Sequence, residues 1–387
     1  MYNIQLLNKI SPSGLAILDK KNYTCGEEID SPLGIIVRSA RMHDMEIPAT
    51  VRGIARAGAG VNNIPVDKCT AQGIVVFNTP GGNANAVKEL TIAALLMSTR
   101  KIYPAIQWAQ SLKGQGAEVT ALVEKGKGKY VGPELYGKRL GVVGLGAIGV
   151  MVCNTALHFG MEVFGYDPYL SVETALKLSR SVKHATSLQE IYESCDFITL
   201  HVPLTSDTKG MINSQSIASM KHGVRILNFS RGELVENEDI IAAVEEKQVY
   251  CYITDFPCEE ILGHYGIITM PHLGASTPES EINCAEMAAR QLKDFLETGN
   301  IKNSVNLPDT QVPYDPHRSR ITVVHRNVPN MISQIAATAS GSNIHHLTNN
   351  SLGDHAYTVM DMDGGVIPEI MGRLNKIDGV IRVTHIK

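Results

Sequence analysis

The stretch Leu140-Gly-Val-Val143-Gly144-Leu-Gly146-Ala-Ile-Gly149 decides the fold of this 387-residue chain. A short apolar run ends at Val143, and apolar residues recur at helical spacing after Gly149. In a GxGxxG pattern the first glycine permits a tight turn, the second admits a pyrophosphate to the backbone, and the third brings helix against strand. The stretch therefore predicts a Rossmann strand–turn–helix, with phosphates at the helix N-terminus.

A second apolar run, residues 161–166, ends in Asp167, 23 residues after Gly144. An acid near this spacing accepts hydrogen bonds from the adenosine ribose. Its charge would repel a 2′-phosphate, so the sequence favours NAD over NADP. The alternative is that Asp167 only caps the glycine turn. A second glycine-rich segment, Arg56-Ala-Gly-Ala-Gly-Val-Asn-Asn63, has Asn63 at the third glycine position and is not counted as a cofactor site.

Composition restricts the class of protein. Apolar residues make up 44% and charged residues 19%, as in soluble globular proteins. The 35 Lys and Arg against 39 Asp and Glu leave a net charge of −4, which offers no electrostatic footprint for nucleic acid or membrane. No signal-peptide pattern opens the chain, and the seven cysteines are widely spaced. We expect a cytoplasmic protein with reduced thiols and no metal site.

Strand and helix patterns on both sides of the glycine turn predict α/β architecture. Three buried strands and a long helix precede the turn, and a segment with four glycines, residues 114–129, predicts a mobile surface connection. Further βα units follow the turn, and an amphipathic helix covers residues 277–297. The expected strands are residues 34–37, 51–57, 74–77, 197–201, 224–228 and 251–255, and the long helix is residues 83–100.

The last part of the chain has its own pattern. Residues 306–320 carry three prolines and little periodicity, which predicts a linker. Beyond it the order strand, helix, strand, strand, helix, strand (βαββαβ) is expected. These elements are predicted at residues 321–324, 329–340, 345–349, 357–362, 367–375 and 380–386.

Three titratable side chains follow predicted strands, where open α/β sheets bind ligands: Arg231, Glu260 and His272. Arg231 lies in Asn-Phe-Ser-Arg-Gly and His272 in Pro-His-Leu-Gly-Ala-Ser. With Arg-Ala-Gly-Ala-Gly from Arg56, Asn-Thr-Pro from Asn78, and Leu-His-Val-Pro from Leu200, these motifs resemble the D-2-hydroxyacid dehydrogenase family. The resemblance covers nearly the whole chain and is strongest to the branch that oxidises D-3-phosphoglycerate.

The resemblance implies a Rossmann dinucleotide-binding domain inserted in a discontinuous flavodoxin-like substrate domain, followed by a βαββαβ domain similar to ACT domains. The implied boundaries are 1–95 and 276–306 for the substrate domain, 96–275 for the NAD-binding domain, 307–319 for the linker and 320–387 for the ACT-like regulatory domain. It also implies a homodimer or homotetramer.

The implied activity is NAD-dependent oxidation of D-3-phosphoglycerate to 3-phosphohydroxypyruvate, the first step of L-serine biosynthesis. His272 would take the hydroxyl proton, Glu260 would orient the ring and favour its charged form, and Arg231 would grip the substrate carboxylate. Glu259 is a rival for Glu260, although the 29-residue spacing from Arg231 favours Glu260. The expected cofactor contacts are Thr79, Gly144, Gly146, Ala147, Ile148, Gly149, Asp167, Val202, Pro203, Phe229, Ser230, Arg231, Asp255, His272, Gly274 and Ala275. The expected substrate contacts are Arg56, Ala57, Gly58, Gly81, Gly82, Asn83, Arg231 and His272.

Two features leave alternatives open. Many relatives carry basic residues where this chain has Ala71 and Gln72, which weakens the phosphate assignment; Arg38 and Lys88 are candidate substitutes. The same-class alternative is a dehydrogenase for another D-2-hydroxyacid, such as glycerate, hydroxypyruvate or D-lactate. An alternative of another class is an NADH-sensing binding protein on the same scaffold.

The tail resembles the ACT version in which a His-x-Asn-x-Pro-Gly segment and a later Asn bind serine. Here the corresponding residues are His325, Asn327 and Asn343, and Asn330 replaces the final glycine. Asn tolerates left-handed backbone better than most residues, so the loop can keep its conformation. The resemblance thus implies an L-serine effector; the alternative is a tail that only dimerises.

Overall fold

The computed structural model describes residues 1–364 and 367–386; residues 365–366 and 387 of the predicted tail lie outside the described residues. The chain divides into two compact units, Met1–Asn83 with Pro278–Lys387, and Ala84–Thr277. The corresponding boundaries expected from the sequence were 95/96 and 275/276. In the described part of the chain no helix is both long and apolar enough to cross a lipid bilayer.

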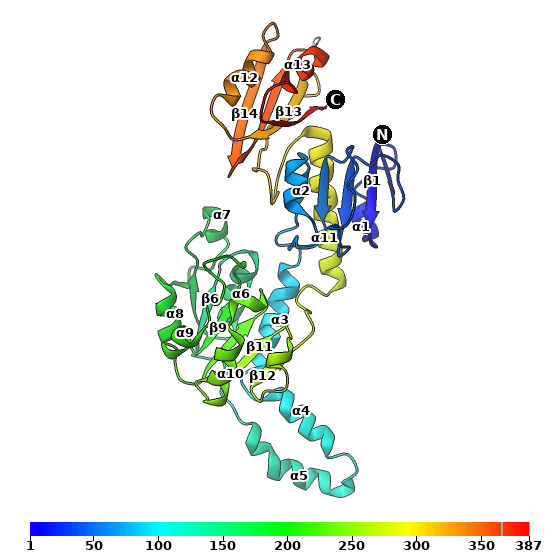
Figure 1. Cartoon of the computed structure of the whole chain (residues 1–387). Helices are drawn as coiled ribbons and strands as arrows, with labels where there is room; N and C mark the ends of the chain where they lie inside the picture. Colours follow the sequence, from blue (N-terminus) through cyan, green and yellow to red (C-terminus); the bar gives the residue numbers. More distant parts are fainter. Residues whose placement is uncertain (365–366, 387) are drawn as a thin grey trace. The chain divides into compact units, whose positions relative to one another are not determined.

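The unit of residues 84–277 is built on a seven-stranded parallel sheet in the order β12-β11-β10-β9-β6-β7-β8 (Figure 1). The strand order reverses between β6 and β9, which is the Rossmann arrangement, and ligands bind at such a switch point. The strands are β6 (Arg139–Val143), β7 (Glu162–Tyr166), β8 (Lys183–His184), β9 (Phe197–Leu200), β10 (Val224–Asn228), β11 (Val249–Thr254) and β12 (Ile267–Thr269). Its longer helices are α3 (Ala84–Met97), α4 (Ile102–Ser111), α5 (Val119–Gly126), α6 (Ala147–His158), α8 (Leu188–Ser194) and α10 (Asn237–Glu245), with short helices α7 (Val172–Ala175) and α9 (Ser214–Ala218).

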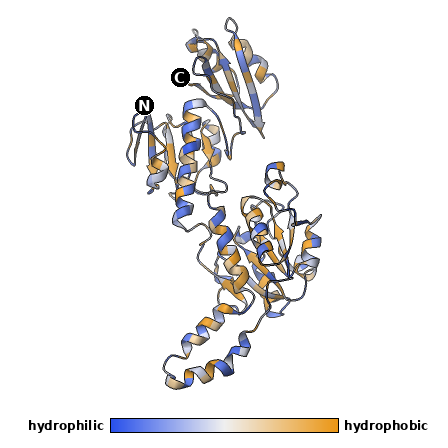
Figure 2. Cartoon of the chain, turned by 180° about the vertical axis from the view of Figure 1, so that it is seen from behind, coloured by the Kyte–Doolittle hydropathy of each residue, from blue (hydrophilic) through white to orange (hydrophobic). Residues whose placement is uncertain are grey.

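Both faces of this sheet are covered. One core contains Ile198, Leu200 and Ile226, and a second contains Leu140 and Val142, all without exposed surface. Figure 2 shows the hydrophobic residues gathered on the strands. Strands buried on both faces have continuous apolar runs, which is why the sequence pattern located them.

The segment expected to be a mobile connection is instead mostly helical, so that prediction was wrong. It contains η1 (Gly116–Glu118), α5 and η2 (Lys127–Tyr130). Gly114 and Gly116 have φ of 98° and 53°, which makes the turn between helices, while Gly126 lies directly against the Trp108 ring. In this segment Gly114 and Gly116 make a turn and Gly126 makes room for Trp108, so these glycines do not indicate a flexible loop. The expected long helix also ends at Met97, before Arg100.

The other unit contains a five-stranded parallel sheet in the order β2-β1-β3-β4-β5, the flavodoxin-like order. Its long helix α11 packs closely, because a Cβ on Gly34 would lie 2.9 Å from Leu292 and a Cβ on Gly53 would lie 3.0 Å from it. The elements are β1 (Tyr2–Leu7), β2 (Tyr23–Gly26), β3 (Gly34–Val37), β4 (Gly53–Arg56), β5 (Val75–Phe77), α1 (Pro12–Leu15), α2 (Val66–Ala71) and α11 (Pro278–Thr298).

The last part of this unit has the expected βαββαβ order, with an antiparallel sheet in the order β14-β15-β13-β16. Helices α12 and α13 share a core with the sheet that contains Ile335, Met360 and Ile370. The elements are β13 (Ser319–Arg326), α12 (Met331–Thr338), β14 (Ile344–Leu352), β15 (His355–Met362), α13 (Ile367–Leu374) and β16 (Val380–Ile386). The predicted fold class is confirmed: two parallel α/β sheets and a separate small antiparallel sheet.

The tail sheet is anchored to the end of α11. Val324, Tyr357 and Val359 belong to the same buried cluster as Phe295 and Leu296. The Tyr357 hydroxyl donates to the Gly299 carbonyl at 2.7 Å.

Arg320 has no exposed surface and lies where α11, the proline-containing segment and the tail sheet meet. Its Nε and Nη2 form a bidentate pair with Asp361 at 2.6 and 2.8 Å. The remaining donors reach the carbonyls of Thr298, Val312 and Pro313 at 2.9, 3.3 and 2.7 Å. All five N–H groups of the guanidinium are thus used.

Candidate functional site

The glycine turn after β6 has the conformation that its sequence requires. Gly144 has φ +92°, and a Cβ there would lie 2.5 Å from the His201 carbonyl. A Cβ on Gly149 would overlap the Gly144 carbonyl oxygen, so the third glycine permits the contact of α6 with the turn. A Cβ on Gly146 would meet no protein atom within 4 Å. The open space at Gly146, at the N-terminus of α6, is where the motif admits a pyrophosphate.

Asp167 follows β7 and holds the turn. One carboxylate oxygen accepts from the Leu145 amide at 2.9 Å and the other from the Tyr169 amide at 2.8 Å. The residue therefore does cap the glycine turn, as one reading of the sequence held. Each carboxylate oxygen can accept two hydrogen bonds, so both retain capacity for ribose hydroxyls.

A buried carboxylate lies at the end of β11. Asp255 is 1% exposed; its Oδ2 accepts from the Gly274 amide at 2.9 Å, and its carbonyl accepts from the His272 amide at 2.9 Å. Burial raises the pKa of Asp255, opposed by the Gly274 amide and the charge of His272. Among the residues that the structure describes, Oδ1 of Asp255 is buried without a partner. Because an unpaired buried carboxylate oxygen is costly, it marks a place for a donor from a ligand.

His272 lies on the loop that Asp255 fixes. Its ring packs on Phe256, with the ring centroids 4.9 Å apart and the planes at 52°. Phe256 follows Asp255 directly and also lies close to Gly232, since a Cβ on Gly232 would come within 3.3 Å of the Phe256 Cβ. The loops that carry Arg231 and His272 therefore meet at one aromatic side chain.

Arg231 follows β10 on a loop that Asn228 shapes. The Asn228 amide donates to the Arg231 carbonyl at 2.8 Å, and its own oxygen accepts from the Ser230 amide. Asn228 has no exposed surface, whereas the Arg231 guanidinium is exposed and donates to the Ser230 carbonyl at 2.6 Å. A buried amide thus presents a solvent-facing guanidinium, able to bind a carboxylate through two donors.

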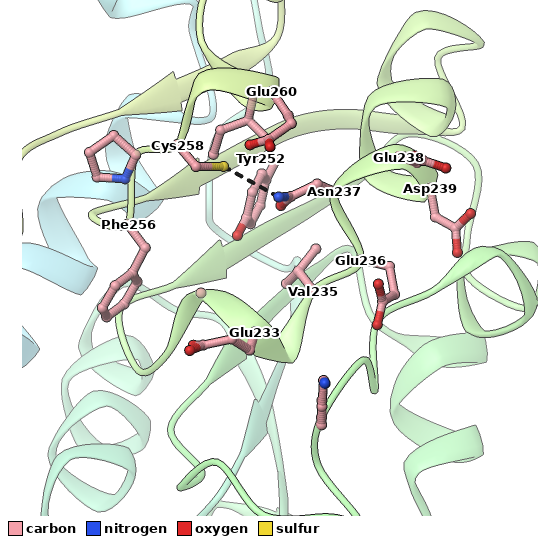
Figure 3. Close-up of a pocket in the computed structure, with 14 residues that line it drawn as sticks. Glu233, Val235, Glu236, Asn237, Glu238, Asp239, Tyr252, Phe256, Cys258 and Glu260 are labelled. Carbon is pink, nitrogen blue, oxygen red and sulfur yellow. Dashed lines mark hydrogen bonds between the residues drawn. The ribbon is translucent and has the colours of Figure 1, made fainter. Parts of the chain in front are cut away.

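Glu260 faces a different part of the unit. It lines a pocket of about 800 Å³ with four more acidic residues and Lys209 (Figure 3). Its carboxylate accepts from the Cys258 thiol, which lowers the pKa of Glu260, while burial and Glu260 raise the pKa of Cys258. Among the described residues no hydrogen bond or ion pair joins Glu260 to His272, and neither His272 nor Arg231 lines this pocket. The other acidic residues are Glu233, Glu236, Glu238 and Asp239.

The remaining expected cofactor contacts of this unit lie at the start of α6 and on the loops after β9, β10 and β12. The Ser230 hydroxyl donates to the Leu200 carbonyl at 2.7 Å, which ties the loops after β9 and β10 together. His201 begins the loop after β9; its Nε2 bonds to the Thr199 hydroxyl at 3.0 Å, and its buried Nδ1 has no partner among the described residues. Burial lowers the pKa of His201 to about 3, so this ring is neutral. The contacts in question are Ala147, Ile148, Val202, Pro203, Phe229, Ser230 and Ala275.

The expected substrate residues of the other unit lie at the carboxyl edge of its sheet. Arg56 ends β4 and donates to the Arg38 and Gly60 carbonyls, which folds its guanidinium over its own loop. Thr79, after β5, is fully buried, and its hydroxyl has no partner within the described part of the chain. Ala57, Gly58, Gly81, Gly82 and Asn83 lie on the same two loops.

Arg38 and Lys88, the candidate substitutes for a phosphate site, are both paired. Arg38 bonds to Glu281 at 2.5 Å, at the start of α11, with both side chains 44% exposed. Lys88 lies 3.5 Å from Glu89. An exposed pair such as Arg38–Glu281 contributes little to stability, so a more strongly charged ligand could take the guanidinium.

The effector residues of the tail lie at two ends of its sheet. The His325 ring is buried and bonded to the Arg326 carbonyl, Asn349 and Thr358. His325 lies opposite Ala356, whereas Asn343 precedes Ile344, which lies opposite Met362. One copy of the tail therefore does not gather the three. Asn330 has φ +66°, the left-handed conformation of a glycine.

These features fit NAD. The glycine turn leaves space at Gly146 and N–H groups at the start of α6, and Asp167 retains acceptor capacity. Among the described residues, Asp255 Oδ1 is an unpartnered acceptor at the end of β11. One side chain that bears on the site, Phe256, carries no signal in the sequence. A Cβ on Gly232 would come within 3.3 Å of the Phe256 Cβ, which is a tight contact.

Residues 92–276 match the family model described as the NAD-binding domain of D-isomer specific 2-hydroxyacid dehydrogenases. The chain is 33% identical to D-3-phosphoglycerate dehydrogenase of Bacillus subtilis (strain 168) over 80% of its own length and 59% of that protein. It is 33% identical to the Homo sapiens enzyme of that name over 80% of the chain and 57% of the relative. The chain thus spans less than two thirds of these relatives.

Among solved structures, the NAD⁺-bound 3-phosphoglycerate dehydrogenase of Entamoeba histolytica matches with a TM-score of 0.60 and 28% identity, over 79% of this chain and 98% of that one. The expectation of NAD is confirmed by the family model that residues 92–276 match, which describes an NAD-binding domain. Residues 92–276 are therefore similar to the NAD-binding domain of D-isomer specific 2-hydroxyacid dehydrogenases.

Proposed function

We propose that this chain is an NAD-dependent D-2-hydroxyacid dehydrogenase that oxidises D-3-phosphoglycerate to 3-phosphohydroxypyruvate, the first step of L-serine biosynthesis. The observation that carries the proposal is the loop at the end of β11. There buried Asp255 fixes the backbone of His272 beside an unpartnered carboxylate oxygen, in a unit whose glycine turn fits NAD. The relatives named above support the choice of substrate.

The groups of the chain divide the work of such a reaction. Gly146, Asp167 and Asp255 would hold the cofactor, which supplies a hydride acceptor when it is bound. Arg231 can grip the substrate carboxylate through paired donors. His272 can take the proton of the hydroxyl at an imidazole nitrogen and return it in the reverse direction. Glu260 is the proposed acid that supports the charged imidazole.

Replacing His272 tests the proton transfer. We expect His272→Asn to lower kcat by ~10² to 10⁴-fold, as loss of a general base does, with NADH affinity unchanged. His264→Asn is the matched control, because His264 lies in the same part of the chain and pairs with Glu245. If His272→Asn keeps more than a tenth of wild-type turnover, the assignment of the base is wrong.

A substrate panel at fixed NADH tests the substrate. Phosphohydroxypyruvate should be reduced with a higher kcat/KM than hydroxypyruvate, glyoxylate and pyruvate. A preference for an unphosphorylated acid would favour the other D-2-hydroxyacid dehydrogenases. NADH binding with no turnover of any acid would favour a cofactor-sensing protein on this scaffold.

The proposal extends to regulation by L-serine through His325, Asn327 and Asn343. Since one copy separates these residues, the proposed site forms between two tails in a homodimer or homotetramer. Initial rates measured with saturating L-serine test this extension, and Asn343→Ala should remove the response. No change in rate and no heat of binding would leave the tail as a dimerisation element.

A further inference from the structure

The aromatic side chain of Phe256 joins two motifs that are distant in the sequence. Its ring contacts the His272 imidazole, with the centroids 4.9 Å apart. Its Cβ lies so near Gly232 that a side chain there would come within 3.3 Å of it. Phe256 lies directly after Asp255, and its amide donates to the Thr254 hydroxyl at 3.2 Å. Its backbone is thus fixed at the end of β11.

The imidazole has few other restraints. The backbone bond from His272 to Asp255 fixes the main chain but leaves the ring free to rotate about its side-chain bonds. Glu260, the acid proposed to support the ring, is bonded to Cys258. In Figure 3 the Phe256 ring and the Glu260 carboxylate lie in separate parts of the pocket. Among the described residues, the ring contact that limits the orientation of the His272 imidazole is therefore the one with Phe256.

We propose that Phe256 is a positioning residue that holds the His272 imidazole in its reactive orientation, and that Gly232 lacks a side chain to make room for it. The proposal rests on the proposed function, since it gives His272 the role of the base. A ring–ring contact of this kind favours one arrangement by roughly 2- to 12-fold. Proton transfer requires the nitrogen within hydrogen-bond reach of the substrate, so a freely rotating ring lowers kcat more than KM.

Three variants separate the ring from its volume. Phe256→Leu keeps an apolar side chain without the ring, and Phe256→Tyr keeps the ring. Phe159→Leu is the control, since it makes the same change at an exposed position at the end of α6. We expect Phe256→Leu to lower kcat by ~10-fold, with KM and NADH affinity within twofold. Phe256→Tyr and Phe159→Leu should stay within twofold of wild type in kcat, in KM and in NADH affinity.

An NMR measurement tests the contact without turnover. In protein labelled with ¹³C at histidine Cε1, the His272 signal is the one lost in His272→Asn. The ring current of Phe256 should displace this signal in wild type and Phe256→Tyr, and Phe256→Leu should move it. An unmoved signal, or a kcat of Phe256→Leu within twofold of wild type, would overturn the proposal. A loss of NADH affinity in Phe256→Leu as large as the loss of kcat would also overturn the proposal, because Phe256 would then contact the cofactor.

The two measurements also separate this proposal from the proposed function. If wild-type protein turns over no 2-hydroxyacid while Phe256→Leu still moves the His272 signal, the proposed function fails and the ring contact stands. If wild type is active and Phe256→Leu is equally active, the proposed function stands and the positioning role fails.

Discussion

The glycine turn of residues 144–149 and the junction at Arg320 achieve close packing in opposite ways. The turn depends on side chains that are absent, because a Cβ on Gly149 would overlap the Gly144 carbonyl. The junction depends on one side chain whose five donors are all used. The turn is local, within six residues, whereas the contacts of Arg320 reach from Thr298 to Asp361. A steric constraint between residues close in sequence can be recognised as a motif. A set of hydrogen bonds between residues far apart in sequence cannot.

The largest expected effect is at the junction. Arg320→Met should cost about 3–5 kcal/mol of unfolding free energy, because it leaves Asp361 buried without a partner. Denaturant unfolding measures the loss, and Arg320→Met combined with Asp361→Leu should recover most of it. Arg318→Met is the control, since Arg318 forms an exposed pair with Asp315 and should cost under about 1 kcal/mol. If Arg320→Met lost less than about 1 kcal/mol of unfolding free energy, the buried network at Arg320 would not differ from an exposed pair.

The glycine turn should respond according to what a Cβ would meet. Gly149→Ala must displace backbone and should cost roughly 1–3 kcal/mol of stability together with NADH binding. Gly146→Ala meets no protein atom, so it should keep wild-type thermal stability and still weaken NADH, because the methyl group enters the space for the pyrophosphate. Gly128→Ala, which also meets nothing, is the control for both. Unchanged NADH affinity in Gly146→Ala would contradict the fit of the cofactor to this turn.

The smallest loss of unfolding free energy should come from a partly exposed ion pair, Asp196–Lys221. Asp196 bonds to Lys221 at 3.1 Å and to the Arg139 amide at 2.8 Å. Burial raises the pKa of Asp196, but the Arg139 amide and Lys221 outweigh it, and the pKa lies below its usual value. Asp196→Asn should therefore cost about 1 kcal/mol at pH 7.

The pH dependence of this difference has a definite sign. A folded-state pKa below the unfolded value, ~3.9, gives stability that is complete above that value and is lost as pH falls through the folded pKa. Urea unfolding of wild type and Asp196→Asn should show the gap at pH 7 and a smaller one below pH 4. A gap that grows on acidification would contradict the pairing. Asp207→Asn, at an exposed loop position, is the control.

The same contrast between local and distant constraints explains which elements could be predicted from the sequence. The central strands of the parallel sheets were predictable because doubly buried strands are apolar runs, whereas β1, β2, β8 and β12 were not predicted. The glycine turn was predictable from its motif, because the close contact of Gly149 with the Gly144 carbonyl lies within six residues. The helices of residues 116–130 were missed, because glycines that make a turn and a close contact with Trp108 have the same composition as a flexible loop.

The candidate site was predictable only as a set of residue types. Arg231, Asp255 and His272 could be placed at strand ends, but their partners could not, since rotamers decide them. The sequence predicts Glu260 beside the His272 imidazole. In the structure Glu260 bonds to Cys258, and the ring that contacts His272 is that of Phe256. In the tail, the strand order was predictable, while the separation of His325 from Asn343 follows from the strand register.

The arrangement around Arg320 also limits how the tail can be exchanged between proteins. Three of its five donors end on carbonyls of Thr298, Val312 and Pro313, outside the βαββαβ fold. A graft of residues 320–386 onto another enzyme would carry a guanidinium that needs those acceptors. A chimera must therefore include residues 298–314 as well, or replace Arg320 and Asp361 together by an apolar pair.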